Sequence, residues 1–93
     1  ILCRFGGEEF AIIMPETDLV EAENSAERLR ATIEEISTDE FPTKLTISFG
    51  VGQLTKWDNE KTILKRVDNA LYRAKELGRN RVVLAEGDAI KRT

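Results

Sequence analysis

The distribution of apolar residues predicts a β-hairpin at the start of the chain. Two short apolar runs, Ile1–Cys3 and Phe10–Met14, have the length and composition of strands. Between them, Gly6 and Gly7 are suited to the positive φ angles of a tight turn. Pro15 ends the second run because proline has no N–H group to donate to a strand ladder. We therefore expect two strands joined by a glycine-containing turn.

Apolar residues at helical spacing follow the hairpin. Thr17 or Asp18 is suited to cap a helix there, and Glu21 stands three residues after Asp18, as a capping box requires. Ser37–Asp39 and Pro42 are typical of a loop and predict the end of this helix. The expected buried stripe consists of Leu19, Ala22, Ala26, Leu29, Ile33 and Ile36.

The clearest strand lies at Leu45–Val51, where apolar residues alternate with small or polar ones. This alternation predicts one buried apolar face. Thr46, Ser48 and Gly50 form the opposite face, which is small enough for close approach by another group. A packed helix would satisfy this face as well as a ligand would.

A second helix and a last short strand complete the pattern. Asp58 or Asn59 is suited to cap the helix, and Gly78 is suited to end it. Val82–Ala85 is apolar and predicts a strand, whereas Glu86–Thr93 is mostly polar and is expected to fray. The expected buried stripe of the helix consists of Ile63, Leu64, Val67, Ala70, Leu71, Ala74 and Leu77.

The expected order is therefore strand, strand, helix, strand, helix, strand. Helices mixed with strands and a hairpin predict an α+β fold, in which helices pack on an antiparallel-rich sheet. The 93 residues provide one domain at most. No apolar run approaches the ~20 residues that a membrane-spanning helix needs.

Composition excludes several kinds of chemistry. The formal net charge of −3 argues against broad electrostatic contact with nucleic acid, which requires a basic surface. The chain has no histidine, so histidine-dependent catalytic triads and zinc sites are excluded. The single cysteine, Cys3, cannot form a disulfide within the chain, which suits a reducing compartment. Any chemistry must therefore use carboxylates, Lys, Arg, backbone groups or a metal bound by oxygen.

The predicted hairpin turn contains the first candidate site. Gly6 and Gly7 leave the backbone bare, so that a phosphate or a base can approach it closely. Glu8 and Glu9 follow directly, and carboxylate oxygens suit Mg2+ or Mn2+. Because neighbouring side chains on extended backbone point to opposite faces, we expect different roles for the two carboxylates. A hairpin tip with solvated acids is the alternative interpretation.

Two cations near the end of the second helix form the second candidate site. Lys75 and Arg79 are suited to bind a triphosphate, the lysine as a point charge and the arginine as a planar fork. Alternatively, they stabilise the helix through its dipole, by about 0.3–1 kcal/mol each. Asp68 and Tyr72, one turn apart, are expected to be structural, and Trp57 is expected to pack in apolar surroundings.

Taken together, these segments resemble the GGDEF domain family of diguanylate cyclases. Arg4–Phe10, with the sequence RFGGEEF, matches the motif that names the family, in its GGEEF form. Thr46–Val51 resembles the family's central strand. Asp68–Lys75, followed by Gly78–Asn80, resembles its last helix. The three motifs occur in the family's order over residues 1 to about 86, and together they are far more specific than the GGEEF motif alone.

The resemblance implies a fold of the nucleotidyl-cyclase or ferredoxin-like (palm) type. It also implies an enzyme that condenses two GTP molecules to cyclic di-GMP with release of pyrophosphate. In the family, two domains face each other with one GTP each, and each 3′-hydroxyl attacks the α-phosphate of the other GTP. The implied partners are therefore GTP, cyclic di-GMP and a second GGDEF domain in a homodimer.

The family's functional residues carry over to matching positions of this chain. Gly6-Gly7 would lie against the nucleotide, and Glu8 would bind Mg2+ or Mn2+ as a catalytic carboxylate. Glu9 would support the site electrostatically as the second catalytic carboxylate. Lys75 and Arg79 would hold the β- and γ-phosphates. Metal and cations would thus neutralise phosphoryl charge, while positioning supplies the rest of the rate enhancement.

The resemblance further implies that a complete domain has another strand and two helices before Ile1. In the family, that part supplies an aspartate and a backbone carbonyl to the metal, the groups that recognise guanine, and a central strand of the sheet. We therefore expect the 93-residue chain, taken as the C-terminal portion of a GGDEF domain, to be inactive alone. Exposed ladder edges predict edge-paired or domain-swapped oligomers, or a sheet in which the hairpin pairs directly with the Leu45–Val51 strand.

Other functions are compatible with the same residues. An inactive GGDEF module that senses GTP or cyclic di-GMP is the main alternative, ahead of an interaction domain built on the same fold. A class III nucleotidyl cyclase has a similar fold, but the GGEEF turn argues against it. No contact with nucleic acid or membrane is expected from this segment, and the parent protein is expected in the bacterial cytoplasm or anchored to the membrane elsewhere. Arg28 and Arg30 are expected on a solvated helix face, although Arg28 matches a position of secondary product contact in some relatives.

Overall fold

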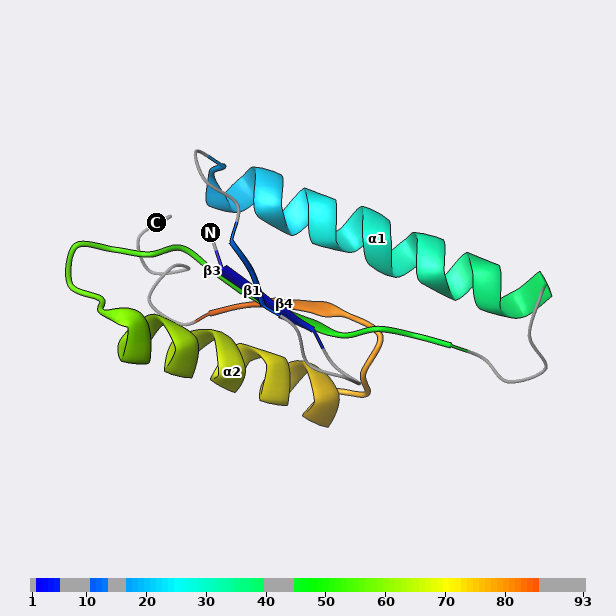
Figure 1. Ribbon diagram of the computed structural model, residues 1–93. Coiled ribbons are helices and arrows are strands. Elements are labelled where there is room, and N and C mark those ends of the chain that lie inside the picture. Colours follow the sequence, from blue (N-terminus) through cyan, green and yellow to red (C-terminus); the bar gives the residue numbers. More distant parts are fainter. Residues whose placement is uncertain (1, 6–10, 14–16, 40–44, 86–93) are drawn as a thin grey trace.

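The computed structural model describes residues 2–5, 11–13, 17–39 and 45–85. It confirms the expected combination of helices and strands, with helices packed on a sheet (Figure 1). No helix in these ranges is both long enough and apolar enough to span a membrane. In chain order, the elements are β1 (Leu2–Phe5), β2 (Ala11–Ile13), α1 (Leu19–Asp39), β3 (Phe49–Gly52), α2 (Glu60–Glu76) and β4 (Val82–Leu84).

The four strands form one mixed sheet in the order β2-β1-β3-β4. β1 runs antiparallel to β2, with Cys3 opposite Ile12, and antiparallel to β3. β3 and β4 run parallel, and this parallel pair was not predicted. We expected the hairpin either to pair directly with the Leu45–Val51 strand or to leave strand edges that pair with another chain. The direct pairing is confirmed, since β1 of the hairpin pairs with β3.

The sheet has two ends with different neighbours. At the Phe49 end, β1 finishes with Phe5 opposite Phe49, and β4 begins beside them. At the Gly52 end, Leu2 lies opposite Gly52, and β4 ends beside them. The chain leaves β3 at the Gly52 end and returns along α2 to the parallel strand β4, so α2 finishes at the Phe49 end.

The helices cover opposite faces of the sheet (Figure 1). Phe49 and Val51 are buried in a cluster with the first turns of α1. Gly50 lies on the other face, where α2 approaches so closely that an added Cβ would stand 2.3 Å from the carbonyl oxygen of Val67. The small face of this strand therefore receives a helix, which is one of the two alternatives that the sequence left open.

Hydrogen bonds of the start of α2 decide between its two candidate caps. Asn59 is the N-cap, and its side chain accepts a hydrogen bond from the backbone N–H of Thr62 while Thr62 Oγ accepts one from the N–H of Asn59. The expected buried stripe is confirmed for Ile63, Val67, Ala70, Leu71 and Ala74. It is wrong for Leu64 and Leu77, which are exposed.

Asp18 caps α1, and its carboxylate accepts a hydrogen bond of 2.8 Å from the N–H of Glu21. The helix runs to Asp39, so the predicted loop at Ser37–Asp39 is wrong. Ser, Thr and Asp lower helix stability by only about 0.7 kcal/mol or less per residue, and Pro42 directly disfavours helix only at the residue before it. A 21-residue helix can therefore continue past this weak signal.

Only the first half of α1 is covered by the sheet. Leu19, Ala22 and Ala26 are buried, as expected, whereas Leu29 and Ile36 are 42% and 47% exposed. The helix is about 32 Å long, while a four-residue strand spans only about 13 Å. Its second half consequently extends past the Phe49 end of the sheet (Figure 1).

Two further expectations need correction. β3 begins at Phe49 rather than at Leu45, and its four residues pair with Leu2–Phe5 of β1. Trp57 was expected to pack in apolar surroundings, but it is 78% exposed, with Lys56 Nζ 4.9 Å from the ring centre. Trp57 lies in the turn that precedes α2, outside the helices and strands.

Candidate functional site

The last turn of α2 ends in a Schellman motif. Gly78, with φ 120°, donates its N–H to the carbonyl of Lys75, and Arg79 donates its N–H to the carbonyl of Ala74 at 2.9 Å. These two bonds satisfy carbonyl groups that a helix end otherwise leaves without partners. The prediction that Gly78 ends this helix is therefore confirmed.

This motif brings the two predicted phosphate-binding cations to one turn. Lys75 lies half-buried on the last turn of α2, and Arg79 is exposed four residues later. Neither side chain forms an ion pair with another residue of the described ranges. Two positive charges on one turn form a site suited to an anion, since Lys and Arg are the usual partners of phosphate oxygens.

Lys75 also lines a hollow of about 380 Å3 on the surface of α2. Asp68, Asn69, Leu71 and Tyr72 form the rest of its described lining. Tyr72 is largely exposed there, so its phenol is accessible. The expected structural role of Asp68 is supported, because its carboxylate pairs with a residue of a strand.

That partner is Arg4 of β1, whose Nε lies 2.9 Å from Asp68 Oδ1. This ion pair joins α2 to the strand that leads into Gly6-Gly7. β1 finishes at the Phe49 end of the sheet, where α2 also finishes. The sheet thus carries the end of β1 and the Lys75 turn to the same end of the domain.

Four of the predicted site residues, Gly6, Gly7, Glu8 and Glu9, lie outside the described residues. Within the described ranges, no group of three or more Asp, Glu, His or Cys side chains is arranged to hold a metal ion. The predicted metal ligand Glu8 is therefore neither supported nor contradicted by the geometry of the site.

Arg30 does not lie on the solvated helix face where it was expected. Its side chain is only 16% exposed and contacts Glu27 and Glu34 on α1, as well as Asn80 beyond the end of α2. Glu27 and Glu34 stand three and four residues from Arg30, so the pairing within the helix was visible in the sequence. The contact with Asn80 was not, because 50 residues separate the two.

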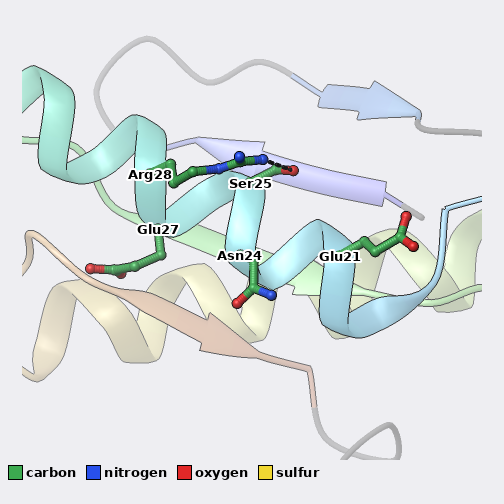
Figure 2. Close-up of a pocket in the computed structure, with 5 residues that line it drawn as sticks. All are labelled: Glu21, Asn24, Ser25, Glu27 and Arg28. Atoms are coloured by element: carbon green, nitrogen blue, oxygen red, sulfur yellow. Dashed lines mark hydrogen bonds between the residues drawn. The ribbon is translucent and has the colours of Figure 1, made fainter.

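A second hollow, of about 620 Å3, lies along α1 (Figure 2). Its described lining consists of Glu21, Asn24, Ser25, Glu27 and Arg28. Arg28 is exposed, as expected, and Nη2 donates a hydrogen bond of 3.4 Å to Ser25 Oγ, as Figure 2 shows. Arg28 and Arg30 are thus only two residues apart but lie in different environments.

Comparison with known proteins identifies the family. The chain belongs to the GGDEF family, because the family model described as "Diguanylate cyclase, GGDEF domain" matches residues 1–81. It is 41% identical to diguanylate cyclase DgcM of Escherichia coli (strain K12) over 91% of this chain and 20% of that protein. It is 40% identical to the probable diguanylate cyclase DgcT of the same strain, over 92% of this chain and 20% of that protein.

A similar relationship exists outside Escherichia coli. The chain is 41% identical to the response regulator PleD of Caulobacter vibrioides, over 87% of this chain and 19% of that protein. The chain therefore spans about a fifth of the length of these curated relatives.

Proposed function

We propose that this domain forms part of a diguanylate cyclase that condenses two GTP molecules to cyclic di-GMP and releases pyrophosphate. Two relatives at about 40% identity are named as diguanylate cyclases, one of them as a probable one, and the GGEEF sequence is intact in this chain. The proposal includes a fold of the nucleotidyl-cyclase palm type and a pair of domains that face each other with one GTP each.

The position of Lys75 and Arg79 is the observation that carries this proposal. Both cations lie on the Schellman turn at the Phe49 end of the sheet, where β1 leads toward the GGEEF segment. In the proposed reaction they hold the β- and γ-phosphates, which leave together as pyrophosphate. Holding them fixes the α-phosphate relative to the 3′-hydroxyl that attacks it, which is a contribution of positioning.

Mg2+ or Mn2+ belongs to the same proposal, with Glu8 as its ligand in this chain. When bound, such an ion neutralises negative charge on the phosphate oxygens. Glu9 would act beside it as a supporting carboxylate. We further propose that the 93-residue chain is inactive alone, since the resemblance assigns the remaining metal ligands and guanine contacts to residues before Ile1.

The test follows GTP turnover by the whole protein that contains this domain, with Mg2+ present and nucleotides separated by chromatography. We expect the wild-type protein to form cyclic di-GMP, and Glu8→Gln to abolish it. Lys75→Ala and Arg79→Ala should each raise KM for GTP by about tenfold or more, because a charge-assisted hydrogen bond contributes about 1.5–3 kcal/mol. Lys61→Ala is the matched control, since this exposed lysine lies on the first turn of α2, at the Gly52 end.

The outcomes separate the cyclase from its main alternative. GTP that is bound but not converted by the folded wild-type protein would favour a nucleotide sensor. If Lys61→Ala raised KM for GTP as much as Lys75→Ala does, the overall positive charge of α2, rather than the Schellman turn, would attract the nucleotide.

A further inference from the structure

Asn80 connects the turn after α2 to two other parts of the domain. Its backbone N–H donates a hydrogen bond of 2.9 Å to the buried Ser48 Oγ, just before β3. Its side-chain oxygen accepts a hydrogen bond of 2.8 Å from Arg30 Nη1 of α1. Its side-chain nitrogen donates to Glu34 Oε2, also on α1. Both side-chain polar groups of Asn80 are therefore held by a single helix on the far side of the sheet.

Arg30 is itself fixed by neighbours on α1. Glu27 accepts hydrogen bonds from Arg30 Nε at 2.9 Å and from Nη2 at 2.5 Å, and Glu34 accepts a longer one from Nη1. The Arg30 guanidinium lowers the pKa of Glu27 below its ordinary value, and Glu27 in turn raises the pKa of Arg30. The guanidinium plane is thus held by carboxylates on both sides, which leaves it little freedom to release Asn80.

The residue before Asn80 has an unusual backbone conformation. Arg79 has φ 64° and Asn80 has φ 50°, both in the left-handed region. Asparagine enters this region readily, but for arginine it costs about 1–2 kcal/mol. Such strained residues persist where the surrounding contacts over-determine them, and they cluster at functional sites. The contacts that fix this turn are the Schellman bonds on one side and the Asn80 bonds on the other.

We propose that Arg30 and Glu34 are positioning residues that hold Asn80, and through it the backbone of Arg79, so that the Arg79 guanidinium meets the GTP phosphates. This inference rests on the proposed function, because it takes Arg79 as a phosphate-binding residue. It adds a contribution from α1 to a turn whose proposed phosphate-binding residues, Lys75 and Arg79, lie at the end of α2. The network of Arg30, Glu34 and Asn80 is called the α1 clamp below.

A purely structural role would make a different prediction. If the α1 clamp served only to attach α1 to the sheet, its loss would lower stability without changing the affinity for GTP. Arg66 offers a matched comparison, since it is an equally well-bonded arginine at the Gly52 end, paired with Asp58 at 2.5 Å and donating to the Gln53 carbonyl.

The experiment measures, by titration calorimetry with Mg2+ present, the affinity for a GTP analogue whose bridge between the α- and β-phosphates is not cleaved, so that turnover does not consume the ligand. Amide hydrogen exchange is measured in parallel, and both use the whole protein that contains this domain. We expect Arg30→Ala to weaken GTP binding about tenfold, within the range that residues without ligand contact are known to exert. The amide protons of Arg79 and Asn80 should exchange faster in this variant. Arg66→Ala should lower the melting temperature about as much as Arg30→Ala does. It should leave the GTP affinity and the exchange rates of the Arg79 and Asn80 amide protons unchanged.

Non-additivity provides the sharpest criterion. In an Arg79→Ala background, Arg30→Ala should cause no further loss of affinity, because residues that act through one another do not contribute independently. Asn80→Gly serves as a second variant that folds readily, since glycine tolerates φ 50° while the side-chain bonds of the clamp are removed. It should reproduce the loss seen with Arg30→Ala.

Each failure has a distinct meaning. A wild-type protein that bound no GTP would overturn the proposed function and with it the role of the clamp. A wild-type protein that bound GTP, with Arg30→Ala and Asn80→Gly equally competent, would overturn the clamp alone. Losses from Arg30→Ala and Arg79→Ala that simply multiplied would also overturn it, since the two residues would then act independently.

Discussion

The two helices of this domain lie on opposite faces of one sheet but are held in different ways. α2 presses its backbone against Gly50 and buries apolar residues along most of its length. α1 is longer, buries apolar residues in its first half and extends past the Phe49 end with Leu29 and Ile36 exposed. In its second half, Ile33 is partly buried, and Arg30 and Glu34 form hydrogen bonds with Asn80.

This difference shows how one small sheet divides its tasks between two helices. Packing against backbone atoms leaves little room for adjustment, so α2 provides a rigid support for Lys75 and the Schellman turn. Hydrogen bonds between side chains depend on a few atoms, and their loss perturbs a smaller region. We therefore expect mutations under α2 to unfold the domain, and mutations along the second half of α1 to act locally.

The largest effect is expected from Gly50→Ala. The new Cβ would lie 2.3 Å from Val67 O and 2.6 Å from Leu71 N, and helix backbone cannot move away as a side chain can. The change should cost more than about 3 kcal/mol of unfolding free energy, at the upper end for overpacked cores. Urea denaturation followed by circular dichroism measures it.

Gly78→Ala is the control for this prediction. Among the described residues, its Cβ would meet only Arg81 Nη2 at 3.2 Å, the end of a flexible side chain, although the φ of 120° adds about 1–2 kcal/mol of strain. A Gly50→Ala protein as stable as Gly78→Ala would show that α2 can move away from the sheet, and the contrast between the helices would then be lost.

The second prediction compares one leucine from each helix. Leu71 of α2 is fully buried, so Leu71→Ala should cost about 3 kcal/mol through lost burial and the cavity it leaves. Leu29 of α1 is exposed, and Leu29→Ala should cost less than about 1 kcal/mol. Parallel urea titrations give the difference directly. Equal losses would mean that the second half of α1 is covered in solution, for example by another copy of the chain.

The smallest of the three effects concerns the start of α2. Asp58 is 6% exposed and accepts hydrogen bonds from Arg66, from Thr55 and from the Thr62 hydroxyl. The bond from Arg66 is the main reason that its pKa lies well below the ordinary value. At pH 7, Asp58→Asn should therefore cost about 2 kcal/mol, the typical contribution of a hydrogen bond to a charged group.

The pH dependence of this loss follows from the direction of the shift. A carboxylate with a lowered pKa in the folded state stabilises the protein fully above its unfolded pKa of about 3.9, and this stabilisation is lost as the pH falls further. The stability difference between the wild-type protein and Asp58→Asn should thus shrink between about pH 4 and pH 2. A difference that stayed constant over this range would contradict the assignment of Asp58 as the charged partner of Arg66.

Much of the fold could be predicted from periodicity alone. The elements and their order follow from apolar spacing, and the ends of α2 follow from Asn59 and Gly78, whose chemistry is local. Lys75 and Arg79 were likewise placed correctly near one turn, since four residues of helix and a glycine reversal determine their separation.

The features that were missed depend on contacts between distant parts of the chain. Apolar spacing gave α1 a full buried stripe, but only the length of the sheet decides that Leu29 and Ile36 stay exposed. The residues next to Arg30 in the sequence do not distinguish it from a solvated arginine. Its environment depends on Asn80, which lies 50 residues away between α2 and β4. Trp57 was assigned to an apolar environment by residue type, whereas its position in a turn keeps it exposed.

The pairing at the Gly52 end has a practical use. Leu2 lies beside Gly52, and Ala85 donates its N–H to Val51 at 2.8 Å, so the first and last described residues lie near each other. Lys75 and Arg79 lie at the opposite end of the sheet. A fluorophore attached at this end of the sheet, for example to a cysteine introduced at the exposed Leu54, should therefore leave the Schellman turn free.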